Sequence, residues 1–267
     1  MSTEKDFSEE LETAERAARE AGAIIMGYYG KDYVIEEKSK NNPVTTADLE
    51  ANRKIQEILL GRYPDDAWLS EESKDDLKRL AAPRVWVIDP IDGTREFIEK
   101  IPQFTVSIGL AVEGRPAVGV VYNPAQAKLY KAARGAGAML NDSPIRVTPQ
   151  EKVEGASLIV SRSEPRKRFQ PFAELCRVQA VGSIAFRLAL IGEGEGDGML
   201  TFRALHEWDV CGGVAVVEGA GGVVIDGQGN NIVFNRRDSL CRGMVASNPT
   251  LAKSLHEMLA KSLAENF

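Results

Sequence analysis

Cysteine and histidine are scarce in this chain of 267 residues. It has three cysteines and two histidines, and the cysteines are widely spaced with no CxxC pair. This spacing is untypical of a zinc site and favours free thiols in a reducing compartment. A catalytic triad or a zinc site built on histidine would need almost the whole supply, His206 and His256. We therefore expect carboxylates to carry any chemistry.

An excess of basic charge and long hydrophobic runs are also missing. The net charge is −6 at pH 7, which argues against a surface that tracks a nucleic acid polymer. The N-terminal MSTEKDFSEELETAERAAREAG is acidic and amphipathic, so no signal peptide is visible, and no run is long enough to span a bilayer. These absences predict a cytoplasmic protein that binds neither a nucleic acid polymer nor a membrane.

Hydrophobic periodicity predicts helices followed by strands and then an alternation of the two. Helices are expected over residues 8–30 and about 47–60, and in the C-terminal LAKSLHEMLAKSLAENF. VWVID, TVSIGLAVE, AVGVVYN and KLYKAA predict an antiparallel meander. After Pro149, SLIVS, VQAVG and GVVID predict strands that alternate with helices in RKRFQPFAELC, SIAFRLALIGEG and WDVCGGVAVVEGAG, as in an α/β fold. We place an internal boundary near TPQEKVEG, between residues 1–150 and 151–267.

The stretch WVIDPIDGTREF combines two acids with a candidate phosphate cradle. If VWVID is a buried strand, Asp89 and Asp92 project from the loop that follows it. Gly93 and Thr94 then open a helix, where backbone N–H groups can receive a phosphate. Two carboxylates beside a phosphate need a cation between them, because the negative charges otherwise repel one another. The alternative is an ordinary strand end followed by an Asp-Gly turn.

Further acids lie where predicted elements begin or end. Glu71 and Glu72 follow an apolar stretch in LSEES, where one can face a site and the other point away. Asp48 lies at a helix start, where a capping box with Thr45 is an equal alternative. Asp209 opens an apolar helix, where a first-turn acid is also common. Together with Asp89 and Asp92, these acids predict an oxygen-rich site for Mg²⁺ rather than zinc.

The motifs SEES, DPIDGT and EWD followed by AGG, in this order and at these separations, closely resemble the inositol monophosphatase superfamily of Mg²⁺-dependent, lithium-sensitive phosphatases. The resemblance extends over essentially the whole chain. It implies an α/β (α+β) fold, a layered αβαβα sandwich. It also implies that residues 1–150 form an α+β half with the antiparallel sheet and most metal ligands, and that residues 151–267 form an α/β half with the last ligand and the substrate pocket.

The resemblance also implies residue roles. Two or three Mg²⁺ ions would be held by Glu71, Asp89, the backbone carbonyl of Ile91, Asp92 and Asp209, with Glu72 in support. Thr94 and Asp48 would orient and activate the attacking water, with Glu71 as the third catalytic residue. The backbone of Gly93 and Thr94 would hold the phosphate, and no covalent phosphoenzyme is needed. Phosphatases that form an aspartyl-phosphate use acids two apart, DxDx[TV], so we reject that mechanism.

The substrate is predicted from weaker features. Inositol-selective members carry an acid seven residues before the last aspartate, and here that position is Phe202. DGTREF and SRSE resemble the 3′(2′),5′-bisphosphate nucleotidase branch, so adenosine 3′,5′-bisphosphate is the first choice. A second phosphate would need a cationic seat, and the candidates are Arg162, Arg166, Lys167, Arg168 and Arg203; a solvated basic loop is the alternative.

Other pocket residues and other functions stay open at this stage. Gly182 and Ser183 would line the sugar side, while Trp208 and His206 are expected to pack rather than to bind a ligand. An inositol monophosphatase or a sugar phosphatase like fructose-1,6-bisphosphatase is the alternative substrate class. A non-catalytic regulator that binds metal or phosphate is a remoter alternative, because fold alone never proves activity. Relatives are often dimers, so a homodimer is possible.

Overall fold

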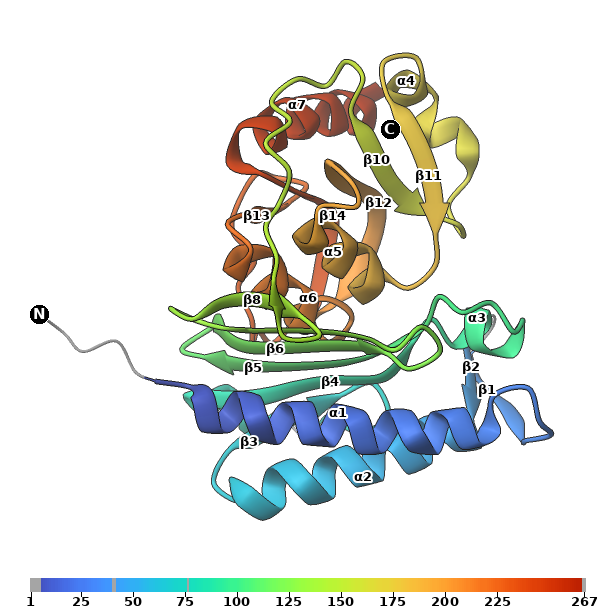
Figure 1. Cartoon of the computed structure of the whole chain (residues 1–267), viewed down its shortest axis with the longest axis vertical. Helices are drawn as coiled ribbons and strands as arrows, with labels where there is room; N and C mark the ends of the chain where they lie inside the picture. Colours follow the sequence, from blue (N-terminus) through green and yellow to red (C-terminus); the bar gives the residue numbers. More distant parts are fainter. Residues whose placement is uncertain (1–5, 40–41, 76, 266–267) are drawn as a thin grey trace, which may run out of the picture.

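The computed structural model describes residues 6–39, 42–75 and 77–265. Its elements form five layers in which two sheets alternate with three layers of helices (Figure 1). Three separate apolar clusters fill the four interfaces between these layers, and the largest lies between the two sheets. The predicted αβαβα sandwich is confirmed.

The larger sheet has seven strands in the order β3-β4-β5-β6-β7-β8-β9. They are β3 Ala67–Ser70, β4 Arg84–Asp92, β5 Thr105–Val112, β6 Arg115–Asn123, β7 Lys128–Ala133, β8 Gly137–Leu140 and β9 Ser143–Pro144. From β4 to β9 every neighbouring pair is antiparallel, which confirms the predicted meander, and only β3 runs parallel to β4.

Two long helices cover the outer face of this sheet (Figure 1). They are α1, Ser8–Tyr28, and α2, Thr46–Arg62, and a hairpin of β1, Ile35–Ser39, and β2, Asn42–Thr45, joins them. Small buried residues such as Ala14, Ala18 and Ala51 face the sheet, so the helices can pack closely against its large side chains. Both helices agree with the predicted ranges to within two residues.

The smaller sheet has five strands in the order β11-β10-β12-β14-β13. They are β10 Ser157–Ser161, β11 Arg177–Val181, β12 Gly198–His206, β13 Val223–Asp226 and β14 Leu240–Ser247. β10 is parallel to β11 and β12, whereas β14 is antiparallel to β12 and β13. Helix α7, Pro249–Glu265, and the short α4, Gln170–Ala173, cover its outer face.

Helices α5, Ile184–Glu193, and α6, Glu207–Gly219, form the middle layer. Their sequences are apolar on nearly every side because sheets lie above and below them. At Gly109 of β5 a Cβ atom would collide with the side chain of Cys211, so glycine is needed for α6 to lie directly on the larger sheet. This close approach places the start of α6 beside the end of β4.

The sequence analysis missed several elements and misjudged one. It placed a single helix over RKRFQPFAELC, where the chain forms a 3₁₀ turn, η2 Arg166–Phe169, and only four residues of α4. It also missed the 3₁₀ turn η1, Lys78–Ala81, and seven strands: β1, β2, β3, β8, β9, β12 and β14. The five-residue helix α3, Thr94–Ile98, was expected only as a helix start. β12 and β14 are central strands, buried for most of their length on both faces, so their sequences do not alternate. The division into residues 1–150 and 151–267 stays a prediction.

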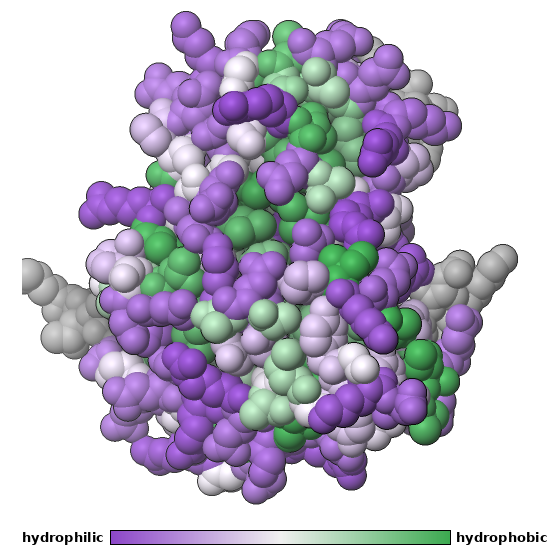
Figure 2. Space-filling view, turned by 45° about the vertical axis from the view of Figure 1, so that its right-hand side comes forward, coloured by the Kyte–Doolittle hydropathy of each residue, from purple (hydrophilic) through white to green (hydrophobic). Residues whose placement is uncertain are grey.

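The surface carries mainly polar side chains. On the face seen in Figure 2 hydrophilic residues predominate, and the hydrophobic ones lie in separate groups between them. Large exposed hydrophobic residues within the described part of the chain are few: Val34, Ile35, Leu49, Leu77, Met139, Leu175 and Val233. No helix among the described residues is long and apolar enough to cross a membrane.

Candidate active site

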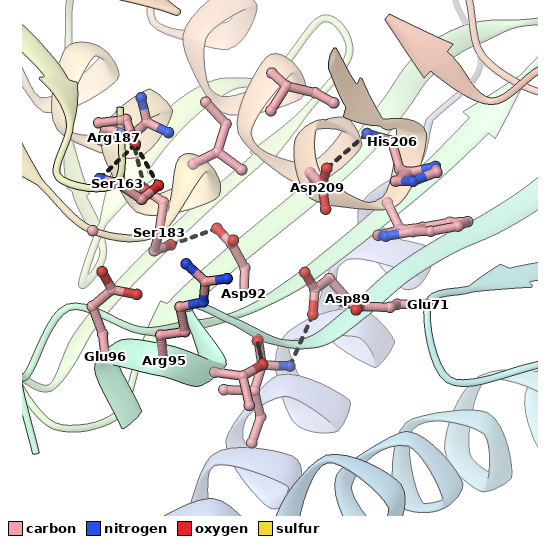
Figure 3. A pocket seen from close by; sticks show the side chains of 18 of the residues that line it. Glu71, Asp89, Asp92, Arg95, Glu96, Ser163, Ser183, Arg187, His206 and Asp209 are labelled. Carbon is pink, nitrogen blue, oxygen red and sulfur yellow. Dashed lines mark hydrogen bonds between the residues drawn. The ribbon is translucent and has the colours of Figure 1, made fainter. Parts of the chain in front are cut away.

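A cavity of about 400 Å³ opens where the two halves of the chain meet. Its wall combines the end of β4 and the start of α3 with the starts of α5 and α6 and the ends of β10 and β12 (Figure 3). Because each of these elements ends or begins at the cavity, side chains far apart in the sequence face one space. Nine of the ten predicted site residues line it directly: Glu71, Asp89, Ile91, Asp92, Gly93, Thr94, Ser183, Arg203 and Asp209. The tenth, Asp48, reaches it through Thr94.

A β-bulge at the end of β4 shapes the acidic turn. Asp89 pairs with Ser107 of β5 and Asp92 pairs with Thr105, so β4 holds one more residue than its partner over this span. Such a bulge redirects side chains and leaves part of the backbone outside the ladder. The Ile91 N–H donates to the Asp89 carboxylate at 3.0 Å. Both aspartates are buried, and both line the cavity.

Three carboxylates from separate elements meet beside this turn. Glu71 follows β3, Asp89 lies in β4 and Asp209 lies in the first turn of α6, and each offers an oxygen within 4.8 Å of the other two. The His206 N–H donates to Asp209 Oδ2 at 2.7 Å, which fixes the orientation of that carboxylate. Figure 3 shows Asp92 beside them, facing the same space.

Burial disfavours the ionised form of these carboxyl groups when no cation is bound. It raises the pKa of Asp89 and Asp209 well above the ordinary value, and the neighbouring carboxylates raise it further. Burial likewise raises the pKa of Asp92 to about 7, although hydrogen bonds from Ser183 and Ala185 oppose the shift. Within the described ranges no lysine or arginine forms an ion pair with these three aspartates. A compact set of carboxylate oxygens fits Mg²⁺, a hard ion that prefers oxygen ligands.

Asp48 combines two roles that the sequence analysis treated as alternatives. Its Oδ2 accepts from the backbone N–H and the hydroxyl of Thr45 at 2.7 and 2.6 Å, so the capping box of α2 is present. Its Oδ1 accepts from the Thr94 hydroxyl at 3.3 Å, which links it to the cavity. Burial raises the pKa of Asp48 to about 7, and the charges of Glu72 and Glu71 add to the shift.

Both the backbone conformation of Gly93 and the close packing around it require glycine. Its φ is +96°, and a Cβ atom there would lie 2.9 Å from the carbonyl oxygen of Gln103. The chain therefore turns sharply from β4 into α3, and Gly93 and Thr94 face the cavity at that turn. This agrees with the predicted helix start after the acidic pair.

Ser183 ties Asp92 to the start of α5. Its hydroxyl donates to Asp92 Oδ2 at 2.5 Å and accepts from the Phe186 N–H at 3.0 Å. The Ala185 N–H donates to the same Asp92 oxygen at 2.6 Å. The other carboxylate oxygen of Asp92 has no partner in the part of the chain that the structure describes, so it is available to a cation.

Of the five basic candidates for a second phosphate, only Arg203 lines the cavity. Its Nη1 donates to the Ser163 hydroxyl at 2.8 Å. Arg162 instead forms an ion pair with Glu96 at 3.1 Å, and Arg168 lies 4.0 Å from Glu164. Arg166, Lys167 and Arg168 belong to the turn before α4, outside the cavity wall, so proposing this loop as a seat in the catalytic cavity was wrong.

The aromatic residues near Asp209 have different surroundings. Phe202 packs in the outer core with Phe169 and Phe172 and does not line the cavity. Trp208 packs against the central core, as expected, but it also lines the cavity, where it stacks on His206 at 4.3 Å between ring centroids. Burial lowers the pKa of His206.

Sequence reasoning overlooked three charged residues in the cavity wall: Arg95, Glu96 and Arg187. For Arg187 a signal was present, because it is the only charged residue among the first nine residues of the predicted helix SIAFRLALIGEG. An isolated charge on a buried helix usually has a specific partner. Its meaning depended on what the helix packs against, which the sequence does not show.

The comparisons with known proteins agree with this geometry. The model of the inositol monophosphatase family matches residues 6–266. The chain belongs to this family. Its members are phosphoric monoester hydrolases that depend on Mg²⁺ and act on small phosphorylated substrates, so this protein is a phosphatase.

Individual relatives within the family carry two kinds of name. The "Nus factor SuhB" of Pasteurella multocida is 33% identical, covering 96% of this chain and 98% of that protein. The "Inositol-1-monophosphatase" of Synechocystis sp. is 37% identical, covering 82% and 79%. The solved structure of an IMPase from Thermotoga maritima is similar with a TM-score of 0.87 at 27% identity, covering 96% and 99%. These names support the inositol monophosphatase alternative more than the nucleotidase branch.

Proposed function

We propose that this family member is a Mg²⁺-dependent phosphomonoesterase of a small phosphorylated metabolite, with inositol monophosphate as the first substrate to test. The meeting of Glu71, Asp89 and Asp209 within 4.8 Å, beside Asp92, supports this proposal most directly. The name of the Synechocystis relative supports the choice of inositol monophosphate.

The contacts around the acidic turn support the residue roles that the family resemblance implies. The four carboxylates and the Ile91 carbonyl would hold two or three Mg²⁺ ions. When bound, Mg²⁺ supplies Lewis acidity that polarises phosphoryl oxygens and makes water a better nucleophile near neutral pH. Lithium would inhibit by competing for such a site, as the family resemblance implies. The backbone N–H groups of Gly93 and Thr94 would hold the phosphate at the turn into α3.

Thr94 and Asp48 would position the attacking water. The Thr94 hydroxyl lies 3.3 Å from Asp48 and 3.1 Å from the Ile91 carbonyl, so its single proton can go to either acceptor. With that proton held away from the cavity, the hydroxyl oxygen can accept a hydrogen bond from water. An Asp48 pKa of about 7 matches a group that exchanges protons near neutral pH.

A bisphosphate nucleotide, the first choice from sequence, is the second candidate substrate. Arg203 supports it, because this arginine faces the cavity and could meet a second phosphate. Phe202, which occupies the position of the inositol-binding acid, supports it too, since a partly buried phenyl ring outside the cavity wall cannot bind hydroxyl groups. A sugar bisphosphate such as fructose 1,6-bisphosphate also carries two phosphate groups, so the same arginine could meet its second phosphate.

A phosphate-release panel tests the function. We expect purified protein to release phosphate from inositol 1-phosphate, adenosine 3′,5′-bisphosphate or fructose 1,6-bisphosphate in Mg²⁺, and to lose this activity in EDTA or excess Li⁺. Recovery when Mg²⁺ is restored after EDTA shows that the protein remained folded. Mg²⁺ binding without release from any of the three esters would favour the non-catalytic regulator and overturn the proposal.

Asp48→Asn tests the water-positioning pair. We expect kcat to fall by about a hundredfold, the usual contribution of a positioned acid–base group. The rise in melting temperature that Mg²⁺ produces should be retained, because Asp48 is not proposed as a metal ligand. Thr45→Val is the matched control: it removes a hydroxyl from the same capping box, should cost about 1 kcal/mol of stability, and should change kcat far less. Equal losses of kcat in the two variants would mean that Asp48 acts only as a helix cap.

Location and assembly stay as predicted from the sequence. A cytoplasmic location, a possible homodimer, and the lack of a nucleic acid polymer or membrane as partner are proposals here. The net charge of −6 supports the absence of a polyanionic partner. Size-exclusion chromatography with light scattering measures the oligomeric state directly.

A further inference from the structure

Asn52 is a buried amide on the inner face of α2. Only 6% of its surface is exposed, and it follows Asp48 by four residues, which is about one helical turn. Residues four apart on a helix share a face, so Asn52 and Asp48 both lie on the buried side of α2. Asn52 does not line the catalytic cavity. Any effect that it has on the chemistry must therefore pass through the residues that it contacts.

Both ends of the Asn52 amide bind the turn that carries Glu71. Its Oδ1 accepts from the hydroxyl of Ser70 at 2.7 Å, and its Nδ2 donates to the hydroxyl of Ser73 at 3.2 Å. The indole N–H of Trp68 donates to the same Ser73 hydroxyl at 3.1 Å. An amide can accept at one atom and donate at the other. Asn52 thus holds the chain on both sides of Glu71.

The backbone at this turn receives less support from regular structure. β3 ends at Ser70, and the described residues between β3 and η1 form turns and irregular structure. The Glu71 N–H donates to the Ile88 carbonyl oxygen at 3.2 Å, and the Ser73 N–H donates to the Ser70 carbonyl oxygen at 3.3 Å. The Glu72 N–H donates to the Ser70 hydroxyl at 3.2 Å. Side-chain hydrogen bonds therefore fix much of the shape of this turn.

The Glu71 carboxylate must stay in place against like charges. Its oxygen lies within 4.8 Å of an oxygen of Asp89 and one of Asp209, and Figure 3 shows its side chain reaching toward Asp89. Carboxylates at such distances repel one another when no cation lies between them. Asp89 is held within β4 and Asp209 within α6, whereas Glu71 follows the end of its strand. Of these three acids, Glu71 therefore depends most on the contacts of its turn.

We infer that Asn52 is a positioning residue for Glu71: by holding residues 70–73, it keeps the Glu71 carboxylate at the acidic cluster before an ion binds. This inference rests on the metal site of the proposed function and deepens it. An assembled site binds an ion more tightly, because less conformational freedom is lost on binding. One face of α2 then supports two parts of the site, with Asp48 at the water-positioning pair and Asn52 at a metal ligand.

A purely structural role for Asn52 is the alternative. In that case its hydrogen bonds only fasten α2 to the end of β3, and their loss lowers the stability of the protein. The folded fraction would then bind Mg²⁺ as tightly as the wild type does. A positioning role instead weakens Mg²⁺ binding by the folded protein, so metal affinity separates the two roles.

The test measures Mg²⁺ binding by isothermal titration calorimetry at pH 8, with Asn52→Ala compared with the wild type. We expect the dissociation constant to rise about tenfold or more, as for other residues that support a metal ligand. Excess Mg²⁺ should restore most of kcat, because the catalytic groups are unchanged. Ser70→Ala should act in the same direction. The double variant should lose little more than Asn52→Ala alone, because both changes remove one shared hydrogen bond.

Ile55→Val is the matched control, because Ile55 is buried on the next turn of α2. It should lower the melting temperature in EDTA and keep the wild-type Mg²⁺ affinity. If Asn52→Ala does not fold in a thermal melt, Ser70→Ala carries the same expectation.

Three outcomes would contradict one inference or both. Folded Asn52→Ala with wild-type Mg²⁺ affinity, or an equal loss of affinity in Ile55→Val, overturns the positioning role and leaves the phosphatase intact. A wild type that binds Mg²⁺ more tightly than Asn52→Ala, yet releases phosphate from none of the three esters, overturns the proposed function alone. A wild type that binds no Mg²⁺ overturns both.

Discussion

Asp92→Asn is expected to abolish Mg²⁺-dependent phosphate release while leaving the protein folded. The amide oxygen can accept the same two hydrogen bonds, from the Ser183 hydroxyl and the Ala185 N–H, that now reach Oδ2. The other position changes from a carboxylate oxygen into an NH₂ group, which cannot bind a cation. Loss of a residue that only hydrogen-bonds to a metal ligand lowers metal affinity or activity roughly 10- to 100-fold. We therefore expect loss of a ligand itself to lower kcat/KM by about a thousandfold or more.

The folding of the Asp92→Asn variant and the specificity of its loss of activity are measured separately. Circular dichroism and thermal unfolding in EDTA should show a protein as stable as the wild type or more stable, because a buried charge has been removed. Asp226→Asn is a suitable control, since Asp226 accepts backbone N–H groups in a turn remote from the cavity wall. An Asp92→Asn enzyme that keeps more than a tenth of the wild-type rate would show that Asp92 is not a metal ligand.

The stability of the chelated protein should fall as the pH rises from about 4 to about 7. Asp48 and Asp92 have an ordinary pKa of 3.8 that burial raises to about 7 in the folded state. The folded protein therefore holds their protons more tightly than the unfolded chain does. This contribution is fully present below the unfolded pKa and is lost as the pH rises through about 7. It is on the order of 4 kcal/mol for each carboxyl.

Mg²⁺ should oppose this loss because it binds the ionised carboxylates. At a hundred times its dissociation constant, one bound ion adds about 2.7 kcal/mol to the free energy of unfolding. The melting temperature should therefore rise with added Mg²⁺, and the rise should be larger at pH 8 than at pH 5.5. Urea unfolding at both pH values, in EDTA and in Mg²⁺, measures the four free energies. Chelated protein whose stability is level or increasing between these pH values would contradict the buried acidic cluster.

The Asp92→Asn variant links the two expectations. Because the variant lacks one carboxyl group of raised pKa, its stability in EDTA should decline less steeply with pH than that of the wild type. It should also respond less to Mg²⁺ at pH 8. The Asp226→Asn control should follow the wild-type curve in both conditions, because Asp226 lies outside the cavity wall.

Periodicity in the sequence predicted the elements whose two faces differ. Helix α2 follows a pattern that local chemistry imposes, because a helix with one buried face must repeat apolar residues at its own period. Strands β5 and β6 are buried at nearly every residue, so they were predicted instead from apolar runs bounded by the turn residues EGRP and NPAQ. Strands β12 and β14 are also buried for most of their length, and their sequences do not alternate.

By itself the sequence determined which chemistry is available. Scarce histidine and cysteine, and acids placed at the ends of predicted elements, indicated hard-metal chemistry, and the order of the motifs indicated the family. These features depend on residue type and local spacing alone.

Only the tertiary structure decided which of these groups meet. It brought Glu71 and Asp209 to Asp89, gave Asp48 its second role at Thr94, and retained Arg203 while excluding the basic turn before α4. It also buried Arg187 against the cavity with no acid to pair it. Electrostatic consequences of this kind depend on distance and burial between elements remote in sequence, and neither quantity is encoded in a local pattern.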